Sequence, residues 1–203
     1  MDAPSVLSDD DYDVVSSMES SLNDYGHIAT QMVREPPPSK MARDKFESVS
    51  WTVDEIQDYT RRSLGVSESG SSSSRTRRVY VDGIFDGFNV GHALQLRQAK
   101  LSFPSVYLIV GVYPDHQLQL HGYIASLPDV ERCEVVRHCR WVDELIGDAP
   151  WVLDSQFLDN HKIDYVALDE GTSVDPAYDK ARIRGYDTVK SLSMLSFYWP
   201  FAT

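Results

Sequence analysis

Cysteine is scarce in this chain of 203 residues, which contains only Cys133 and Cys139. The two stand six positions apart in a helical pattern and face different sides, which disfavours a disulfide between them. No second cysteine pair is present to complete a zinc site of the usual spacing. We therefore expect reduced thiols and a soluble protein of the cytoplasm or nucleus.

Long apolar runs are also missing. No stretch approaches the ~20 residues that a helix needs to span a bilayer, and the N-terminus has no basic segment followed by an apolar one. We expect no signal peptide and no transmembrane helix. A long basic amphipathic stretch is absent as well, so the sequence does not support membrane association.

Basic residues are outnumbered by acidic ones. Lys and Arg total 19 against 31 Asp and Glu, which gives a formal net charge of −12. Nucleic-acid binding depends on many Lys and Arg contacts to phosphates, so this balance argues against a nucleic-acid partner. A small anionic substrate stays possible, because one local positive site can overcome a negative overall field.

The chain divides by composition. Residues 1–50 are acidic and serine-rich, contain three consecutive prolines, and predict a disordered tail. Residues 51–66 predict a short helix that begins at Thr52, which has capping-box spacing to Glu55, and ends at Gly65. Residues 67–77 are a serine-rich linker. Residues 78–190 form the expected folded domain, and residues 191–203 are an atypical C-terminal tail.

Strands and helices alternate within the domain. We expect strands at 79–81, 106–112, 141–145 and 163–168, and helices at 91–100, 130–140 and 155–161. The run VYLIVGV at 106–112 is apolar throughout, as in a strand covered on both faces. This order predicts an α/β fold with a Rossmann-like, doubly wound parallel sheet. Ligands of such folds lie at the carboxyl ends of the strands, where the 82–92 and 169 regions fall.

The most informative stretch is RVYVDGIFDGFNVGHALQLRQAK at 78–100. It runs from a strand through a glycine-containing turn into a helix whose first turn holds Gly91 and His92. Unpaired N–H groups and the helix dipole favour an anion at such a helix start. The stretch is neither a Walker phosphate loop nor a dinucleotide fingerprint, because it lacks both glycine patterns.

The stretch instead resembles the H-x-G-H block of the nucleotidyltransferase superfamily, and specifically the choline-phosphate cytidylyltransferases. The resemblance continues through YLIVGV at 107–112, ER at 131–132, HCRWVDE at 138–144, APW at 149–151 and IDYVALD at 163–169, and the segment 52–65 is similar to fungal members. It covers roughly residues 52 to 170, in several separate blocks in the same order. It implies the nucleotidyltransferase fold.

The resemblance implies transfer of CMP from CTP to phosphocholine, which yields CDP-choline and pyrophosphate in phosphatidylcholine biosynthesis. It also implies a homodimer, because the block with Arg140 lies at the dimer contact in the family. Mg²⁺ is expected with CTP from the chemistry of nucleoside triphosphates, although no carboxylate cage for a resident metal ion is evident. An acceptor phosphate is already anionic, so the step needs positioning and charge neutralisation more than a general base.

The resemblance also assigns the site residues. His92 matches the second histidine of the block and Asn89 stands at the first, so these two are the candidate catalytic residues. The candidate nucleotide-binding residues are Ile84, Phe85, Asp169 and His121. The candidate phosphocholine-binding residues are Asp82, Gln95 and Trp151, because a trimethylammonium group is held by an aromatic face and a carboxylate. His92 could instead be a helix cap, Trp151 core packing, and Asp82 and Asp86 turn residues. Glu131 with Arg132 is treated as an ordinary surface pair outside the site.

Three departures from the family pattern bear on activity. Asn89 replaces a histidine and cannot carry positive charge. His121 stands where the family has a lysine before Gly122. The family's closing motif, RTEGISTS, does not follow residue 190, and Ser191 and Ser193 do not replace it, so a truncated domain is expected. Two alternatives therefore stay open: a catalytically impaired paralogue that acts as a dimer partner or binding module, and an enzyme for phosphoethanolamine, although Trp151 favours choline.

Overall fold

The computed structural model describes residues 35–65, 75–169 and 196–199. The chain divides into two compact units, Met1–Pro36 and Pro37–Thr203. Only the last two residues of the first unit are described, so the fold given below is that of the second unit. The predicted tail lies mostly outside the described residues, as do most of the predicted linker and of residues 170–203.

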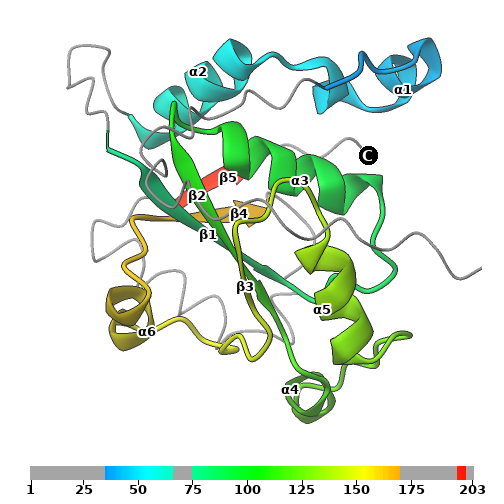
Figure 1. Cartoon of the computed structure of the whole chain (residues 1–203), viewed down its shortest axis with the longest axis vertical. Helices are drawn as coiled ribbons and strands as arrows, with labels where there is room; N and C mark the ends of the chain where they lie inside the picture. Colours follow the sequence, from blue (N-terminus) through cyan, green and yellow to red (C-terminus); the bar gives the residue numbers. More distant parts are fainter. Residues whose placement is uncertain (1–34, 66–74, 170–195, 200–203) are drawn as a thin grey trace, which may run out of the picture. The chain divides into compact units, whose positions relative to one another are not determined.

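The second unit is built on one sheet of five strands in the order β3-β2-β1-β4-β5, and every pair is parallel (Figure 1). The strands are β1 (Arg77–Gly83), β2 (Val106–Val112), β3 (Glu144–Ile146), β4 (Tyr165–Asp169) and β5 (Ser196–Trp199). The chain moves outward from β1 to β3 and then returns to the other side of β1 with β4. The predicted doubly wound α/β sheet is confirmed, and its order reverses between β1 and β4.

Helices cover both faces of the sheet. They are α1 (Lys40–Lys45), η1 (Glu47–Ser50, a 3₁₀ turn), α2 (Val53–Leu64), α3 (Val90–Leu101), α4 (Asp115–Leu120), α5 (Asp129–Arg137) and α6 (Ser155–Asn160). Figure 1 shows α3 and α5 on one side of the sheet and α6 on the other. The buried clusters agree, because Leu96 of α3 and Val136 of α5 share one cluster while Leu158 of α6 belongs to another.

Alternation along the strands explains these two clusters. On β1, Val79 and Val81 pack into the cluster under α3 and α5, whereas Tyr80 packs into the cluster under α6. On β2, Leu108 and Ile109 divide in the same way. Successive side chains of a strand point to opposite faces, so a strand covered on both sides must be apolar at every position. The expectation for residues 106–112 is confirmed.

The helix before the domain forms as its capping signals predict. The Thr52 hydroxyl accepts from the Glu55 N–H at 3.3 Å, and the Glu55 carboxylate accepts from the Thr52 N–H at 2.7 Å. Gly65 ends α2 in the left-handed conformation at φ 64°. The predicted disordered tail, however, extends too far toward the C-terminus. Residues 40–50 contain α1 and η1, and the α1 cap, a bond from the Ala42 N–H to the Ser39 hydroxyl, was not recognised.

Other boundaries differ for local reasons. The predicted strand at 141–145 lies at 144–146, because Cys139 and Val142 are joined by a turn and Trp141 packs into the core. The helix at 130–140 ends at Arg137, where the Cys139 N–H bonds back to the Val136 carbonyl. Helix α4 was missed, because its six residues are too short for a helical period to be read. Both cysteines are free thiols, as expected.

Candidate active site

The carboxyl ends of three strands are held in line by backbone hydrogen bonds beyond the sheet ladder. The Tyr113 N–H donates to the Gly83 carbonyl at 3.2 Å, which joins the ends of β1 and β2. The Ala149 N–H donates to the Val112 carbonyl at 3.2 Å, which brings in the segment after β3. Residues that follow these strands therefore meet at one edge, the edge where parallel α/β folds bind ligands.

Asn89 and His92 shape the start of α3. Asn89 is the N-cap, and its side-chain oxygen accepts from the Gly91 N–H at 2.9 Å. The Asn89 N–H donates to Nδ1 of His92 at 3.1 Å. A ring nitrogen that accepts carries no proton, so the neutral imidazole has its proton on Nε2. The capping bond thereby leaves Nε2–H as a donor, for which the described residues provide no partner.

The surroundings of His92 favour this neutral form. Its ring contacts the rings of Phe85 and Phe88, with centroid distances of 5.4 Å and 5.5 Å, and the two phenyl rings lie 6.5 Å from each other. Burial lowers the pKa of His92 below its ordinary value, and the nearby Asp86 carboxylate opposes this only in part. Phe85 itself has a φ of 54°, in the left-handed region that a bulky residue rarely adopts. Such backbone strain is typical of functional loops whose surroundings over-determine the conformation.

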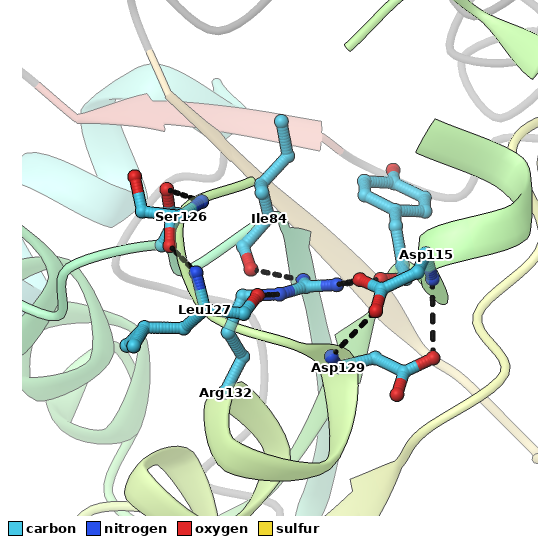
Figure 2. Close-up of polar contacts among 8 residues, drawn as sticks. Ile84, Asp115, Ser126, Leu127, Asp129 and Arg132 are labelled. Atoms are coloured by element: carbon cyan, nitrogen blue, oxygen red, sulfur yellow. Dashed lines mark hydrogen bonds and ion pairs between the residues drawn. The ribbon is translucent and has the colours of Figure 1, made fainter. Parts of the chain in front are cut away.

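Arg132 holds the loops of this edge together (Figure 2). It is fully buried, and its guanidinium donates to three backbone carbonyls: Leu127 at 3.0 Å, Ile84 at 2.6 Å and Tyr113 at 2.9 Å. A fourth bond, at 2.7 Å, reaches the Asp115 carboxylate. These partners lie in the loop after β1, in the segment after β2 and before α5. The prediction that Arg132 belongs to a surface pair is wrong.

Carboxylates complete the network around Arg132. Asp86 accepts from the N–H groups of Ser126 at 2.7 Å and Leu127 at 3.0 Å, and these bonds lower the pKa of Asp86 (Figure 2). Asp115 and Asp129 accept from each other's N–H at 3.1 Å, and the bond from Arg132 is the main cause of the lowered pKa of Asp115. These bonds to the segment before α5 are those of a structural loop residue, in line with the interpretation of Asp86 as a turn residue.

An aromatic cluster lies on the same edge. Trp151 is 7% exposed and contacts Tyr113 and Tyr123, with centroid distances of 4.9 Å and 5.7 Å. His121 stacks on Trp151 at 4.0 Å with an interplanar angle of 7°. The predicted nucleotide-binding residue His121 and the predicted phosphocholine-binding residue Trp151 are therefore in direct contact.

The remaining predicted site residues lie on β1, in the loop after it, on α3 and at the end of β4. Asp82 is 9% exposed near the end of β1, in register with Gly111 of β2. The Ile84 carbonyl accepts a hydrogen bond from Arg132, which fixes this part of the loop after β1. Gln95 is half-buried one turn after His92. Asp169 ends β4, beside β1, but its side chain lies outside the described residues.

Three contributors were missed from the sequence: Arg132, Tyr113 and Tyr123. The only available signal was the position of Arg132 inside a block that resembles the family, since a lone arginine on a helix is more often exposed. Among the described residues, no group of three His, Cys, Asp or Glu side chains could hold a metal ion. Likewise, none of the helices in the described ranges is long and apolar enough to cross a membrane.

Residues 80–195 match the family model described as Cytidylyltransferase-like, which spans more than half of the chain. The chain belongs to the cytidylyltransferase-like family. In this cytidylyltransferase-like chain, the matched region starts in β1 and includes every predicted site residue.

Several curated relatives are similar to it. Choline-phosphate cytidylyltransferase 2 of Arabidopsis thaliana is 56% identical over 99 residues, which is 49% of this chain and 33% of that protein. The probable choline-phosphate cytidylyltransferase of Schizosaccharomyces pombe is 45% identical over 139 residues, or 66% of this chain and 38% of that protein. An ethanolamine-phosphate cytidylyltransferase of Dictyostelium discoideum is 36% identical over 106 residues, or 52% of this chain and 29% of that protein. The cytidylyltransferase-like chain thus spans little more than a third of these relatives at most.

Proposed function

We propose that this chain carries the nucleotidyl-transfer site of a choline-phosphate cytidylyltransferase that serves phosphatidylcholine biosynthesis. A phosphate oxygen of phosphocholine attacks the α-phosphorus of CTP and forms a new P–O bond. The bond between the α-phosphorus and the bridging oxygen breaks, and pyrophosphate leaves with the electron pair. No proton has to be removed from the nucleophile, so the protein's task is to position the two substrates and to neutralise charge.

The observation that carries this proposal is the start of α3. His92 presents a neutral Nε2–H because its Nδ1 is occupied by the Asn89 N–H. A helix N-terminus adds roughly half a positive charge and further N–H donors at the same place. Donors fixed before the reaction stabilise charge that develops on phosphate oxygens without reorganisation.

The same geometry favours slow turnover. Asn89 and His121 stand where the family has a histidine and a lysine, and Arg132 is fully engaged by the loops. Loss of one oxyanion donor commonly costs ~10²–10³ in rate. The Asn89 oxygen is used for the helix cap, but its side-chain N–H₂ group retains its donor capacity and recovers part of this loss.

Choline is the preferred acceptor. The Trp151 ring offers the aromatic face that suits a quaternary amine, and Asp82 at the end of β1 is a candidate for the accompanying carboxylate. The relatives with the higher identities are also named for choline phosphate. Mg²⁺ enters as part of the CTP complex, and two copies of the chain pair through the segment that contains the exposed Arg140.

The test is a reaction of the full chain with labelled CTP, Mg²⁺ and phosphocholine, followed by detection of CDP-choline and pyrophosphate. The diagnostic variant is His92→Gln. Glutamine is a regular partner at this position of a capping box, so the helix start is kept while the ring Nε2–H is lost. We expect about a 100-fold lower rate. His116→Gln, at an exposed position of α4, is the matched control and should retain the full rate. Equal rates for the two variants would remove His92 from the mechanism.

A second candidate function belongs to another class. The replacements at Asn89 and His121 favour a catalytically impaired dimer partner or binding module. Such a protein would bind CTP in calorimetry and co-purify with an active relative, yet a folded sample would give no CDP-choline above buffer. Phosphoethanolamine in place of phosphocholine, in the same assay, tests the third candidate.

A further inference from the structure

The contact between His121 and Trp151 bears on how the acceptor site opens. The two rings are nearly parallel, at 7°, with their centroids 4.0 Å apart. Two rings at that separation are in van der Waals contact. The imidazole therefore fills the space directly above one face of Trp151, a side chain that is only 7% exposed.

A quaternary ammonium group needs this kind of space. Cations bind over an aromatic face within ~6 Å of the ring centroid, and Trp is the best of the three rings. Tyr113 and Tyr123 also contact Trp151, at interplanar angles of 55° and 49°, so Trp151 belongs to a cluster of aromatic rings. The stacked face of Trp151 is therefore closed to a cation while His121 remains in place.

The backbone holds His121 at this point. His121 is the C-cap of α4, and the helix ends in a Schellman motif: the Tyr123 N–H donates to the Leu118 carbonyl at 2.8 Å and the Gly122 N–H to the Gln119 carbonyl at 3.1 Å. Gly122 adopts the left-handed conformation that this motif requires, with φ 77°. The α-carbon of His121 is thus fixed above the aromatic cluster.

The ring itself is less tightly held. His121 is exposed, and no hydrogen bond to its imidazole is formed within the described part of the chain. Stacking on Trp151 is the contact that keeps it there. Rotation about the side-chain bonds would uncover the Trp151 face without any change in the helix or in the motif at Gly122.

We propose that His121 is a built-in cap of the acceptor site, which occupies the Trp151 face in place of the trimethylammonium group and must swing out before that group binds. This inference rests on the proposed function for the identity of the acceptor. An aromatic pair contributes about 0.5–1.5 kcal/mol beyond its buried area, which converts to a reduction of acceptor affinity by roughly two- to ten-fold. His121 is then a residue that sets acceptor affinity, and not only a weakened phosphate ligand.

The test uses choline as the probe, because choline carries the ammonium group without a phosphate. Binding is followed by tryptophan fluorescence in the full chain, in His121→Ala and in His116→Ala. His116 lies in the same helix and is exposed, so it is the matched control. We expect His121→Ala to bind choline about two- to ten-fold more tightly than the unaltered chain. His116→Ala should bind as the unaltered chain does.

Two further measurements test whether the higher choline affinity of His121→Ala arises at the Trp151 face. The double variant His121→Ala, Trp151→Phe keeps an aromatic ring in the core but should bind choline less tightly than His121→Ala, because Phe attracts cations less strongly; binding is followed here by calorimetry, since the reporting tryptophan is removed. The uncharged isostere 3,3-dimethyl-1-butanol should bind His121→Ala no more tightly than it binds the unaltered chain. The inference is overturned if His121→Ala binds choline no more tightly than the unaltered chain, if neither binds it, or if the uncharged isostere gains equally.

The outcome of this test can be distinguished from the outcome of the test of the proposed function. Choline binding needs neither CTP nor turnover, so a tighter choline site in His121→Ala together with no response to CTP would reject the transferase and keep the cap. Formation of CDP-choline, together with unchanged choline binding in His121→Ala, would support the transferase and reject the cap.

Discussion

Replacement of Arg132 by methionine tests the network that joins the loops of the site. Arg132→Met keeps a long side chain of similar shape and removes every hydrogen bond of the guanidinium. Three backbone carbonyls, those of Ile84, Tyr113 and Leu127, then lose a charged donor, and the Asp115 carboxylate loses its ion-pair partner; the bond to Tyr113 is buried and the other two are partly buried. Water can enter for some of them, because the Asp115 side chain is 36% exposed.

The magnitude follows from these four contacts. A buried acceptor left without a donor costs about 1–3 kcal/mol, and loss of one partner of a buried ion pair costs about 3–5 kcal/mol. Since Asp115 and parts of the loops can be resolvated, we expect a decrease of about 3–5 kcal/mol in the free energy of unfolding. A domain has only about 5–15 kcal/mol in total, so the variant should be marginal. The expected decrease in Tm is roughly 10 °C.

Urea denaturation followed by circular dichroism measures the effect. Arg137→Met is the matched control, because Arg137 lies on the same helix but is 54% exposed in its pair with Glu134. An exposed pair contributes about 0.2–1 kcal/mol. Arg132→Lys should fall between the two, since it keeps the charge but not the planar fork. If Arg132→Met loses no more stability than Arg137→Met, the network does not hold the loops together and the reasoning fails.

Three other changes test separate parts of the structure. Thr52→Ala removes the hydroxyl that caps α2 and should lower the free energy of unfolding by about 1 kcal/mol in a urea titration; a neutral result would contradict the cap to Glu55. Gln98 is 1% exposed, and within the described ranges neither of its amide atoms has a hydrogen-bond partner. Gln98→Leu should therefore raise the free energy of unfolding by about 1 kcal/mol, whereas a decrease would reveal a polar role for the amide. Burial lowers the pKa of His92 in the folded chain, so the unfolded chain binds a proton first as the pH falls. The free energy of unfolding should therefore decrease from about pH 7 toward pH 5. His92→Gln should reduce this pH dependence, and an unchanged pH dependence would assign it to other groups.

Features that depend on neighbouring residues were predictable. The capping box of Thr52 and Glu55 fixed the start of α2, and the apolar run at 106–112 gave the bounds of β2 without error. Each of these signals acts within one element, so the sequence alone contains the whole physical cause. Elements with weak local signals were harder: α4 has six residues, and the turn after α5 shifted β3 toward the C-terminus.

The sequence by itself therefore determined the alternating α/β fold, the phosphate-type turn before α3 and the family resemblance. These follow from periodicity, caps and consecutive motif residues. Only the tertiary structure decided that Arg132 is buried among three loops and that His121 lies on Trp151. The residues in these contacts are far apart in the chain, and they meet because parallel strands bring their carboxyl ends to one edge. No pattern of neighbouring residues predicts these contacts.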